Sequence, residues 1–325
     1  MREQEAGESL KLLISIVVPC YNESDVFPVL RKELVSLAER WASKYQTEFV
    51  LIDDGSRDDT WMQMQQFAAE DPRVVAVSLS RNFGHQSALT CGYDFAEGDA
   101  VVSLDADLQD PPEVIPDLVQ AWENGADIVY AVRAHREDSY FKKLTAQLFY
   151  RIFLALTETS APLNTGDFRL MNRQSLEAFK KLREQHRYIR GMIGWLGFRT
   201  AEIEYERKPR RLGYSKYPFH KMLAFALNAI VSFSIFPLRL AYFSAIFASL
   251  SIFGYITYVL VTHFLFGALL VPGWSSVLAC ITIFGFLNLF CLGIMGEYIG
   301  RLYEESKQRP LYLIYKTKES AKDLP

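Results

Sequence analysis

The stretch from Leu240 to Gly296 contains no Asp, Glu, Lys or Arg and a single His. About 20 apolar residues are enough to cross a bilayer as a helix, so this stretch can hold two such helices and the turn between them. Pro272 and Gly273 mark the turn. We therefore predict a transmembrane hairpin over residues 240–300, with helices at about 240–266 and 277–297, embedded in a lipid bilayer.

Positive charge flanks the predicted hairpin on both sides. The basic residues are Arg207, Lys208, Arg210, Arg211, Lys216, His220, Lys221 and Arg239 before it, and Arg301, Lys307, Arg309, Lys316 and Lys318 after it. Because cytoplasmic segments carry an excess of Lys and Arg, both flanks are predicted to be cytoplasmic. Residues 1–11 form a polar, acidic tail without the apolar core of a signal peptide, so the N-terminal domain is predicted to stay in the cytoplasm too.

A shorter apolar segment, Met222 to Phe236, has 15 residues and precedes the hairpin. It is short for a span, and a third span would place the basic C-terminal end outside the cell. We interpret it as an interfacial helix on the inner leaflet. Residues 211–239 are thus predicted to form a basic neck with this helix, and residues 301–325 a cytoplasmic C-terminal tail.

The N-terminal two thirds alternate short apolar runs with segments of helical periodicity. The predicted strands are Leu12–Val18, Phe49–Ile52, Val74–Leu79, Ala100–Leu104 and Ile128–Val132. Strict strand–helix alternation is typical of an α/β domain with a mainly parallel sheet and right-handed crossovers. The length of 325 residues is typical of about two domains, and we assign residues 12–210 to this one.

Acidic residues follow the predicted strands where each one ends. They are Glu23, Asp53, Asp54, Asp105 and Asp107. The carboxyl ends of parallel strands share one edge of the sheet, and ligands of such sheets bind at that edge. The sequence therefore places an acidic site there. For Glu23 and Asp54 the alternative interpretation is capping of the following helix.

The pair Asp105 and Asp107, one residue apart at the end of a buried strand, is the most informative part of this site. Two neighbouring carboxylates repel each other unless a cation lies between them. Mg²⁺ and Mn²⁺ favour one or two carboxylates together with phosphate oxygens. Two solvated loop aspartates would be the simpler explanation, but the convergence of acids at one edge favours a metal.

Several classes of protein are excluded or disfavoured. The net charge of −3 gives no reason to expect nucleic acid as a partner, and the four cysteines show neither metal-ligand spacing nor a disulfide framework. The chain has no dinucleotide fingerprint, P-loop, nucleophile elbow or H-E-x-x-H motif. An acidic cytoplasmic site joined to a membrane hairpin suits a soluble phosphate-bearing donor and a membrane-embedded phosphate-bearing acceptor.

Thr165–Arg169 is predicted to be a loop in which Asp167 and Arg169 form a local salt bridge or contact substrate.

Five segments together carry a resemblance to a known family. They are V-V-P-C-Y-N-E (17–23), D-D-G-S (53–56), D-A-D-L-Q-D-P-P-E (105–113), G-D-F-R-L (166–170) and R-L-G-Y-S-K-Y (211–217). In this order they resemble the family 2 glycosyltransferases of GT-A fold. Within these, the chain is most similar to the polyprenyl-phosphate glycosyltransferases, which include dolichol-phosphate mannose synthases and GtrB-type undecaprenyl-phosphate glucosyltransferases. The resemblance covers residues 12 to about 310.

Two differences from related enzymes are visible. Asp110 stands where the mannose synthases typically have His. The sequence around Gln185 does not match the Q-x-x-R-W signature of processive polymer synthases, which makes a polymerase a poor interpretation.

The resemblance implies a role for each matching residue of the donor site. Contacts to the nucleotide sugar are implied for Pro19, Tyr21, Glu23, Asp53, Asp105 and Arg133. Binding of Mg²⁺ or Mn²⁺ on the diphosphate is implied for Asp105, Asp107 and Gln109.

The resemblance also implies an acceptor site. Contacts to the lipid phosphate are implied for Arg211, Ser215 and Lys216, although juxtamembrane positive charge is the alternative for these residues. Asp167 and Arg169 would face the acceptor and, with Asp107, act in catalysis, with Asp167 either a general base or a positioning group.

The implied reaction is inverting transfer of a hexose from a nucleotide sugar to polyprenyl phosphate. Glucose from UDP-glucose and undecaprenyl phosphate are favoured; GDP-mannose, UDP-aminoarabinose and UDP-N-acetylhexosamine are alternative donors. A non-catalytic, nucleotide-sugar-binding membrane scaffold is the rival from another class. The expected location is the bacterial inner membrane, with the catalytic domain and both termini cytoplasmic. We also expect a homo-oligomer, because family members associate and small residues such as Ala245, Ser249 and Gly254 let helices approach.

Overall fold

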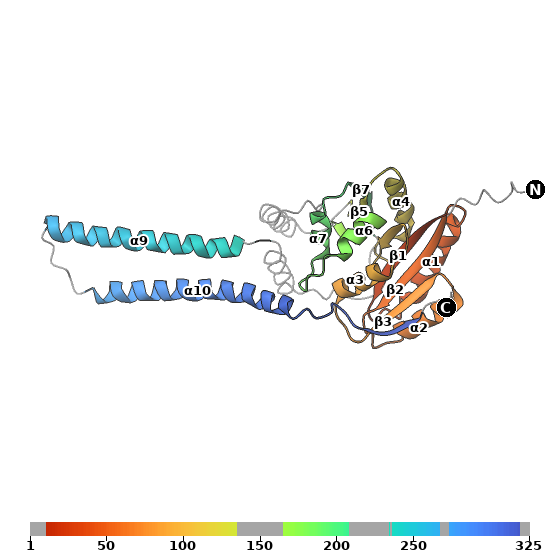
Figure 1. Ribbon diagram of the computed structural model, residues 1–325, viewed down its shortest axis with the longest axis horizontal. Coiled ribbons are helices and arrows are strands. Elements are labelled where there is room, and N and C mark those ends of the chain that lie inside the picture. Colours follow the sequence, from red (N-terminus) through yellow and green to blue (C-terminus); the bar gives the residue numbers. More distant parts are fainter. Residues whose placement is uncertain (1–10, 135–164, 208–233, 235, 267–272, 319–325) are drawn as a thin grey trace, which may run out of the picture. The chain divides into compact units, whose positions relative to one another are not determined.

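The described part of the chain forms two units (Figure 1). The computed structural model describes residues 11–134, 165–207, 234, 236–266 and 273–318. The first unit is an α/β domain that contains residues 11–134, 165–207 and 310–318. The second is a pair of long helices within residues 234–309.

Four parallel strands make up the predicted half of the sheet. They are β1 (Leu12–Cys20), β2 (Tyr45–Asp53), β3 (Val74–Leu79) and β4 (Ala100–Ser103). β1 pairs in parallel with both β2 and β4, and β2 pairs in parallel with β3. Nearly continuous apolar runs suit strands that are covered on both faces, as these are. Their carboxyl ends share one edge, as the sequence predicts.

The helices that follow these strands are α1 (Phe27–Trp41), α2 (Thr60–Glu70), α3 (His85–Phe95) and α4 (Ile115–Glu123), the last preceded by a short 3₁₀ turn, η1 (Pro112–Val114). α3 packs very closely against β1. A Cβ on Gly92 of α3 would lie 2.2 Å from Cγ1 of Val17, so only glycine permits this approach. This contact fixes the N-terminus of α3, and with it His85, beside the carboxyl edge of the sheet.

The second half of the sheet contains the predicted strand at Ile128–Val132 but also a strand that was not predicted from the sequence. Its strands are β5 (Ile128–Arg133), β6 (Thr165–Asn172) and β7 (Thr200–Tyr205), and its helices are α6 (Arg173–Lys180) and α7 (Ile189–Trp195). β6 lies antiparallel between β4 and β5. The predicted loop at Thr165–Arg169 is therefore wrong. Its charged residues lie inside a buried central strand, where Asp167 and Arg169, two positions apart, share one face and neutralise each other.

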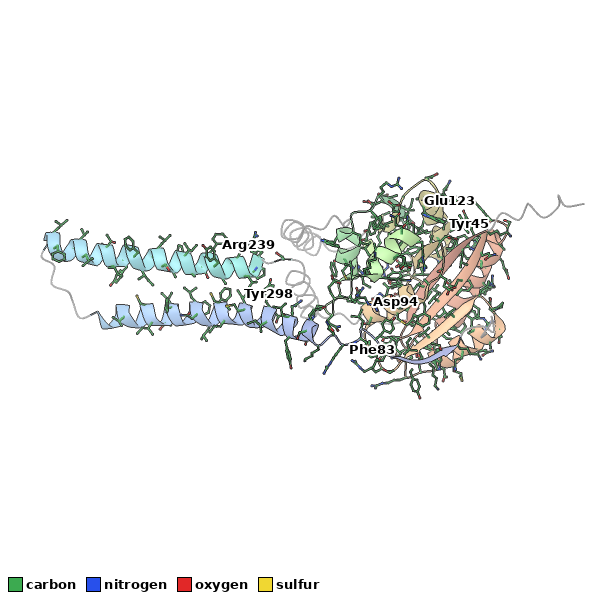
Figure 2. All side chains as sticks on the ribbon, in the orientation of Figure 1. Tyr45, Phe83, Asp94, Glu123, Arg239 and Tyr298 are labelled. Carbon is green, nitrogen blue, oxygen red and sulfur yellow. The ribbon has the colours of Figure 1, made fainter. Side chains whose placement is uncertain are left out.

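The other edge of the sheet is formed by a strand from the end of the chain. β8 (Ile314–Lys318) pairs antiparallel with β3, and the amide of Ser80 donates to the carbonyl of Leu313. The Tyr312 hydroxyl also donates to Asp94 Oδ2 (2.7 Å). Asp94, labelled in Figure 2, lies at the end of α3. Residues 314–318, within the predicted C-terminal tail, thus form an edge strand of the α/β domain.

The second unit consists of α9 (Phe236–Phe266) and α10 (Trp274–Ser306), which run side by side (Figure 1). The segments Phe236–Thr262 and Cys280–Ser306, 27 residues each, are long and apolar enough to cross a membrane. Their large apolar side chains point outward rather than into a protein core. Both helices run beyond the predicted bounds, and α10 continues past Glu297, which pairs with Arg301 one turn later at 2.9 Å.

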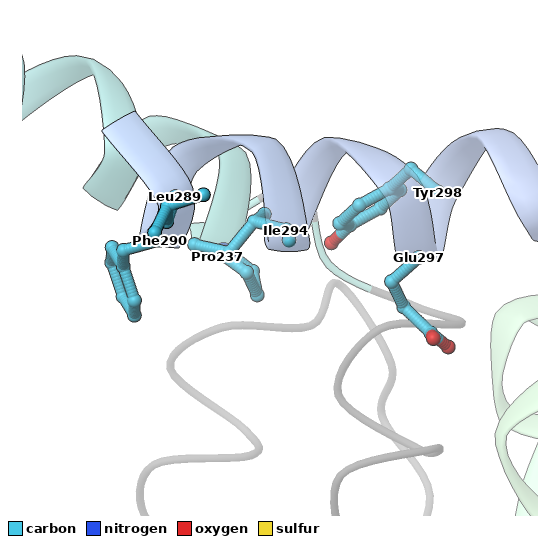
Figure 3. A pocket seen from close by; sticks show the side chains of 7 residues that line it. Pro237, Leu289, Phe290, Ile294, Glu297 and Tyr298 are labelled. Carbon is cyan, nitrogen blue, oxygen red and sulfur yellow. The ribbon is translucent and has the colours of Figure 1, made fainter. Parts of the chain in front are cut away.

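A pocket of about 360 Å³ lies between the start of α9 and the second half of α10 (Figure 3). It is lined by Pro237, Leu289, Phe290, Gly293, Ile294, Glu297 and Tyr298. The Tyr298 hydroxyl donates to the carbonyl of Ser234 (2.6 Å), which closes one end of the hairpin.

Candidate active site

The loop after β4 carries the predicted metal ligands. Asp105, Asp107 and Gln109 are partly exposed, whereas Ala106, Leu108 and Asp110, which alternate with them, are buried. Leu108 adopts a left-handed conformation (φ 55°), and the Gln109 amide donates to Asp107 Oδ1 at 3.1 Å. This tight turn thus leaves the three predicted ligands accessible at the carboxyl edge of the sheet.

The charge of Asp105 is only partly compensated. Its closest cationic partner among the described residues is His85, whose Nε2 lies 3.7 Å from Oδ1, and its side chain is 27% exposed. Desolvation by the surrounding protein raises the pKa of Asp105 to about 6; His85 opposes the rise, and Asp167, Asp110 and Asp107 add to it. A carboxylate in such a position is favourable mainly when a cation joins it.

The donor set fits a hard divalent cation. In the described part of the chain, no group of three His, Cys, Asp or Glu side chains converges as a complete metal site. Asp105 and Asp107 offer two carboxylates, and Gln109 offers an amide oxygen. Mg²⁺ is held in this way when water and substrate phosphates complete its coordination, so these residues fit a metal that arrives with a diphosphate.

Asp167, on β6, is surrounded by cations. Its Oδ1 accepts from Arg169 Nη2 (2.8 Å) and Arg190 Nε (3.1 Å), and its Oδ2 accepts from Arg190 Nη2 (3.1 Å) and lies 3.2 Å from His85 Nε2. Burial alone would raise the pKa of Asp167, but Arg190, His85 and Arg169 together hold it well below its usual range. Asp167 therefore stays ionised and is a poor proton acceptor, which favours a positioning role over general-base catalysis.

Arg169 does not face an acceptor. Its side chain is fully buried, at 0% exposure, and Nη2 donates to the Gly166 carbonyl (2.9 Å) as well as to Asp167. Its Nε and Nη1 are buried without a hydrogen-bond partner in the described chain. The prediction that Arg169 contacts the acceptor is therefore wrong, because β6 is covered on both faces; Arg169 instead supports Asp167.

The loops after β1 and β2 meet at the same edge. The Asn22 amide donates to Ser56 Oγ (3.0 Å), and the Arg57 amide donates to Asn22 Oδ1 (2.8 Å). Tyr21 is exposed, Glu23 is half-buried and Pro19 is buried at the end of β1. These loops bring together three of the residues predicted to contact the nucleotide.

Asp53 and Asp54 mainly shape these loops. Asp53 is buried and accepts from the Ser56 amide (3.0 Å) and the Ser78 hydroxyl (2.8 Å). Asp54 accepts from the backbone amides of Phe83 (2.7 Å) and Gly84 (2.9 Å). Phe83, labelled in Figure 2, lies just before α3. Asp54 therefore does not cap the helix that follows it, α2, as the alternative interpretation held; it binds two loop amides immediately before α3 instead.

Arg133 belongs to a cluster around Asp110. The Asp110 carboxylate is fully buried and accepts from the Tyr205 hydroxyl; Arg207 Nε lies 3.4 Å and Arg133 Nη2 lies 3.9 Å from its Oδ1. A Cβ on Gly166 would lie 2.9 Å from Arg133 Nη2, so this glycine leaves room for the guanidinium. The cluster ties the loop of Asp105 and Asp107 to the ends of β5 and β7.

Comparison with known proteins identifies the family. A family model described as glycosyl transferase family 2 matches residues 15–179, which include most of β1, all of β2 to β6 and most of α6. The chain belongs to glycosyltransferase family 2. Its sheet is that of a GT-A glycosyltransferase, as the resemblance predicts.

Relatives of this family 2 glycosyltransferase match nearly its whole length. A bactoprenol glucosyl transferase of Shigella phage SfV is 41% identical over 94% of this chain and 99% of its own. A prophage bactoprenol glucosyl transferase homolog of Escherichia coli (strain K12) is 40% identical over 94% of this chain and 99% of its own. The glycosyltransferase YkcC of Bacillus subtilis (strain 168) is 42% identical over 93% of each chain. The similarity thus extends beyond the α/β domain into the two long helices.

The structure brings some of the predicted site residues to one edge of the sheet and adds two neighbours that the sequence did not predict. The predicted Asp105, Asp107, Gln109, Asp167 and Arg133 lie at or beside the carboxyl edge, and Arg211, Ser215 and Lys216 lie outside the described residues. His85 and Arg190 were not predicted. The only local signal was the Gly84–His85 pair, which starts a helix at the end of β3; α7 carries no motif that marks Arg190.

Proposed function

We propose that this glycosyltransferase transfers glucose from UDP-glucose to undecaprenyl phosphate, with inversion at the anomeric carbon. The observation that carries this proposal is the only partly compensated carboxylate of Asp105 beside Asp107, at the carboxyl edge of a family 2 domain. The names of the bactoprenol glucosyl transferases, similar over nearly the whole chain, support glucose as the sugar and bactoprenol phosphate, a polyprenyl phosphate, as the acceptor.

The donor is proposed to bind across the loops after β1, β2 and β4. Tyr21, Glu23 and Pro19, with Asp53 beneath them, are suited to hold the base and ribose, while Asp105, Asp107 and Gln109 hold Mg²⁺ or Mn²⁺. The metal, when bound, offsets the charge that builds up on the departing nucleoside diphosphate. Arg133, which Asp110 and Gly166 position, adds a second positive group for that phosphate.

The acceptor needs orientation rather than deprotonation. A lipid phosphate monoester is already anionic near neutral pH, so it can attack the anomeric carbon without a general base. The low pKa of Asp167 agrees with this, because a carboxylate held by three cations does not take up a proton. Arg211, Ser215 and Lys216 are proposed to meet the lipid phosphate from the neck.

The membrane arrangement follows from charge. α9 and α10 are proposed to span the bacterial inner membrane with the turn outside and the catalytic domain and both termini in the cytoplasm, because the basic residues flank the hairpin. We also propose a homo-oligomer on the basis of the family resemblance and the small residues of α9.

A donor panel tests the proposal. The purified full-length protein in detergent is given undecaprenyl phosphate with UDP-glucose, GDP-mannose, UDP-aminoarabinose or UDP-N-acetylglucosamine, and the lipid product is identified by mass. A hexosyl product from UDP-glucose is expected. A product from another donor only would correct the sugar, and no product from any donor would favour the binding scaffold.

The stereochemistry of the product tests the displacement. A single displacement with inversion predicts a β-linked sugar from the α-linked donor. NMR of the isolated lipid would show this directly, and an α-linked product would exclude the single-displacement mechanism.

A further inference from the structure

We propose that Arg190 is the guanidinium that contacts a substrate phosphate in the active site, and that Asp167 and Arg169 are positioning residues behind it. This inference rests on the proposed transfer between two phosphate-bearing substrates. From the sequence, Arg169 was expected to contact the substrate. The contact is instead assigned to Arg190, which lies on α7.

The geometry of the Arg190–Asp167 pair leaves part of the guanidinium available. Arg190 binds both carboxylate oxygens side-on, through Nε and Nη2, at 3.1 Å each. Its Nη1 makes no hydrogen bond within the described residues, and its side chain is 33% exposed. An arginine has donors on all three nitrogens, so the free edge of Arg190 can take an oxyanion while the other edge stays fixed.

The groups in direct contact with Asp167 carry more positive charge than this one carboxylate neutralises. One carboxylate is shared by two guanidinium groups, those of Arg169 and Arg190. Arg169 is fully buried and cannot be reached. Of these two guanidinium groups, only that of the partly exposed Arg190 can therefore contact a ligand. Guanidinium groups match phosphate oxygens in planar, bidentate geometry.

Arg190 also lies close to the donor side of the site. Asp167 Oδ2 is 3.2 Å from His85 Nε2, and the same nitrogen is 3.7 Å from Asp105 Oδ1. Arg190 is thus separated by His85 and Asp167 from a carboxylate proposed to hold the metal. Burial lowers the pKa of Arg190, but the Asp167 and Asp105 carboxylates raise it by more, so the pKa lies above its usual value and Arg190 stays charged.

Two phosphates could occupy the free edge, the acceptor phosphate and the donor diphosphate. The chemistry is the same for both, a phosphate oxygen on a fixed guanidinium. The alternative is a purely structural Arg190, which would tie α7 to β6 and touch neither substrate.

Arginine footprinting on the wild-type full-length protein in detergent tests the inference without any substitution. The protein is treated with phenylglyoxal alone, with UDP and Mn²⁺, or with undecaprenyl phosphate, and modified arginines are mapped by mass spectrometry. Arg190 is expected to react in the free protein and to be protected by one of the two ligands, which identifies the phosphate source. Arg199 is a matched control: it holds Asp127 through Nε (3.1 Å) and Nη2 (3.4 Å) and should react equally in all samples.

Kinetics of Arg190→Gln and Arg190→Lys, with Arg199→Gln as the control, provide the second readout. Loss of a charge-assisted hydrogen bond should raise the KM of the protecting substrate by about tenfold or more, with a smaller rise for Arg190→Lys. A KM unchanged for both substrates, or an Arg190 that neither ligand protects, would overturn the inference. A wild-type protein that transfers no sugar from any donor would instead overturn the proposed function.

Discussion

Replacing Asp167 by Asn tests the charge cluster at the centre of the sheet. Asn keeps the size of the side chain but removes the negative charge, and one carboxylate oxygen becomes an NH₂ donor that faces other donors. Arg169 is then left with a fully buried charge whose only described ion pair is lost. Its Nε and Nη1 are already without partners in the described chain, and the Gly166 carbonyl, which accepts from Nη2, carries no charge to replace the carboxylate.

The size of the effect follows from this burial. Breaking a buried ion pair from one side costs about 3–5 kcal/mol, because a charge remains uncompensated in the protein. The loss of the ion pair with Arg190 adds less destabilisation than the loss of the pair with Arg169, because the Arg190 side chain is 33% exposed and water can solvate it. For a domain of this size, about 1 kcal/mol lowers the melting temperature by roughly 2–4 °C, so a decrease of about 6–20 °C is expected.

Thermal unfolding of the full-length protein, followed by tryptophan fluorescence, measures this decrease. Four of the five tryptophans, Trp41, Trp61, Trp122 and Trp195, lie outside the two long helices and report on the α/β domain. The double variant Asp167→Asn with Arg169→Met should be more stable than Asp167→Asn alone, because the buried charge has been removed. Glu70→Gln, which breaks the surface pair with Arg31, is the control and should melt close to wild type. A melting temperature for Asp167→Asn within about 2 °C of wild type would refute the reasoning.

Three further predictions concern other parts of the chain. The hydrogen bond from Arg199 lowers the pKa of Asp127, so the Asp127 carboxylate stabilises the fold above its unfolded pKa of about 4 and loses that effect as the pH falls through its folded pKa. Asp127→Asn should therefore have a lower melting temperature than wild type at pH 7, and the difference should close in acid. A difference that does not change with pH would contradict this. Lys216→Glu should raise the KM for lipid phosphate, whereas an unchanged KM would indicate only juxtamembrane charge. Tyr312→Phe removes the 2.7 Å bond to Asp94 and should weaken hydrogen-exchange protection in β8 but not in β1; unaltered protection of β8 would mean that the strand is held without this bond.

The parallel half of the fold could be predicted because its strands are apolar on both faces. The runs that became β1, β2 and β3 and the acidic ends of β2 and β4 needed no tertiary information. The carboxyl-edge rule for parallel sheets then placed Asp105 and Asp107 correctly.

β6 was missed because two charged residues interrupt its apolar pattern. Asp167 and Arg169 look like loop residues until their mutual pairing, and the contacts from α3 and α7, are known. β8 was missed for the opposite reason: all five of its residues are exposed, so it has no buried face to leave a pattern. Arg190 and His85 come from helices far apart in the sequence and meet only through Asp167, which no local pattern could predict.

Mn²⁺ binding measured by electron paramagnetic resonance tests the central claim most directly, since it reports on the Asp105–Asp107 loop without relying on turnover. With UDP present, wild-type protein is predicted to bind Mn²⁺ stoichiometrically, and Asp107→Ala is predicted to lose this binding while its α/β domain still unfolds at the wild-type temperature. If Asp107→Ala bound Mn²⁺ as tightly as wild type, the metal site proposed here would be contradicted.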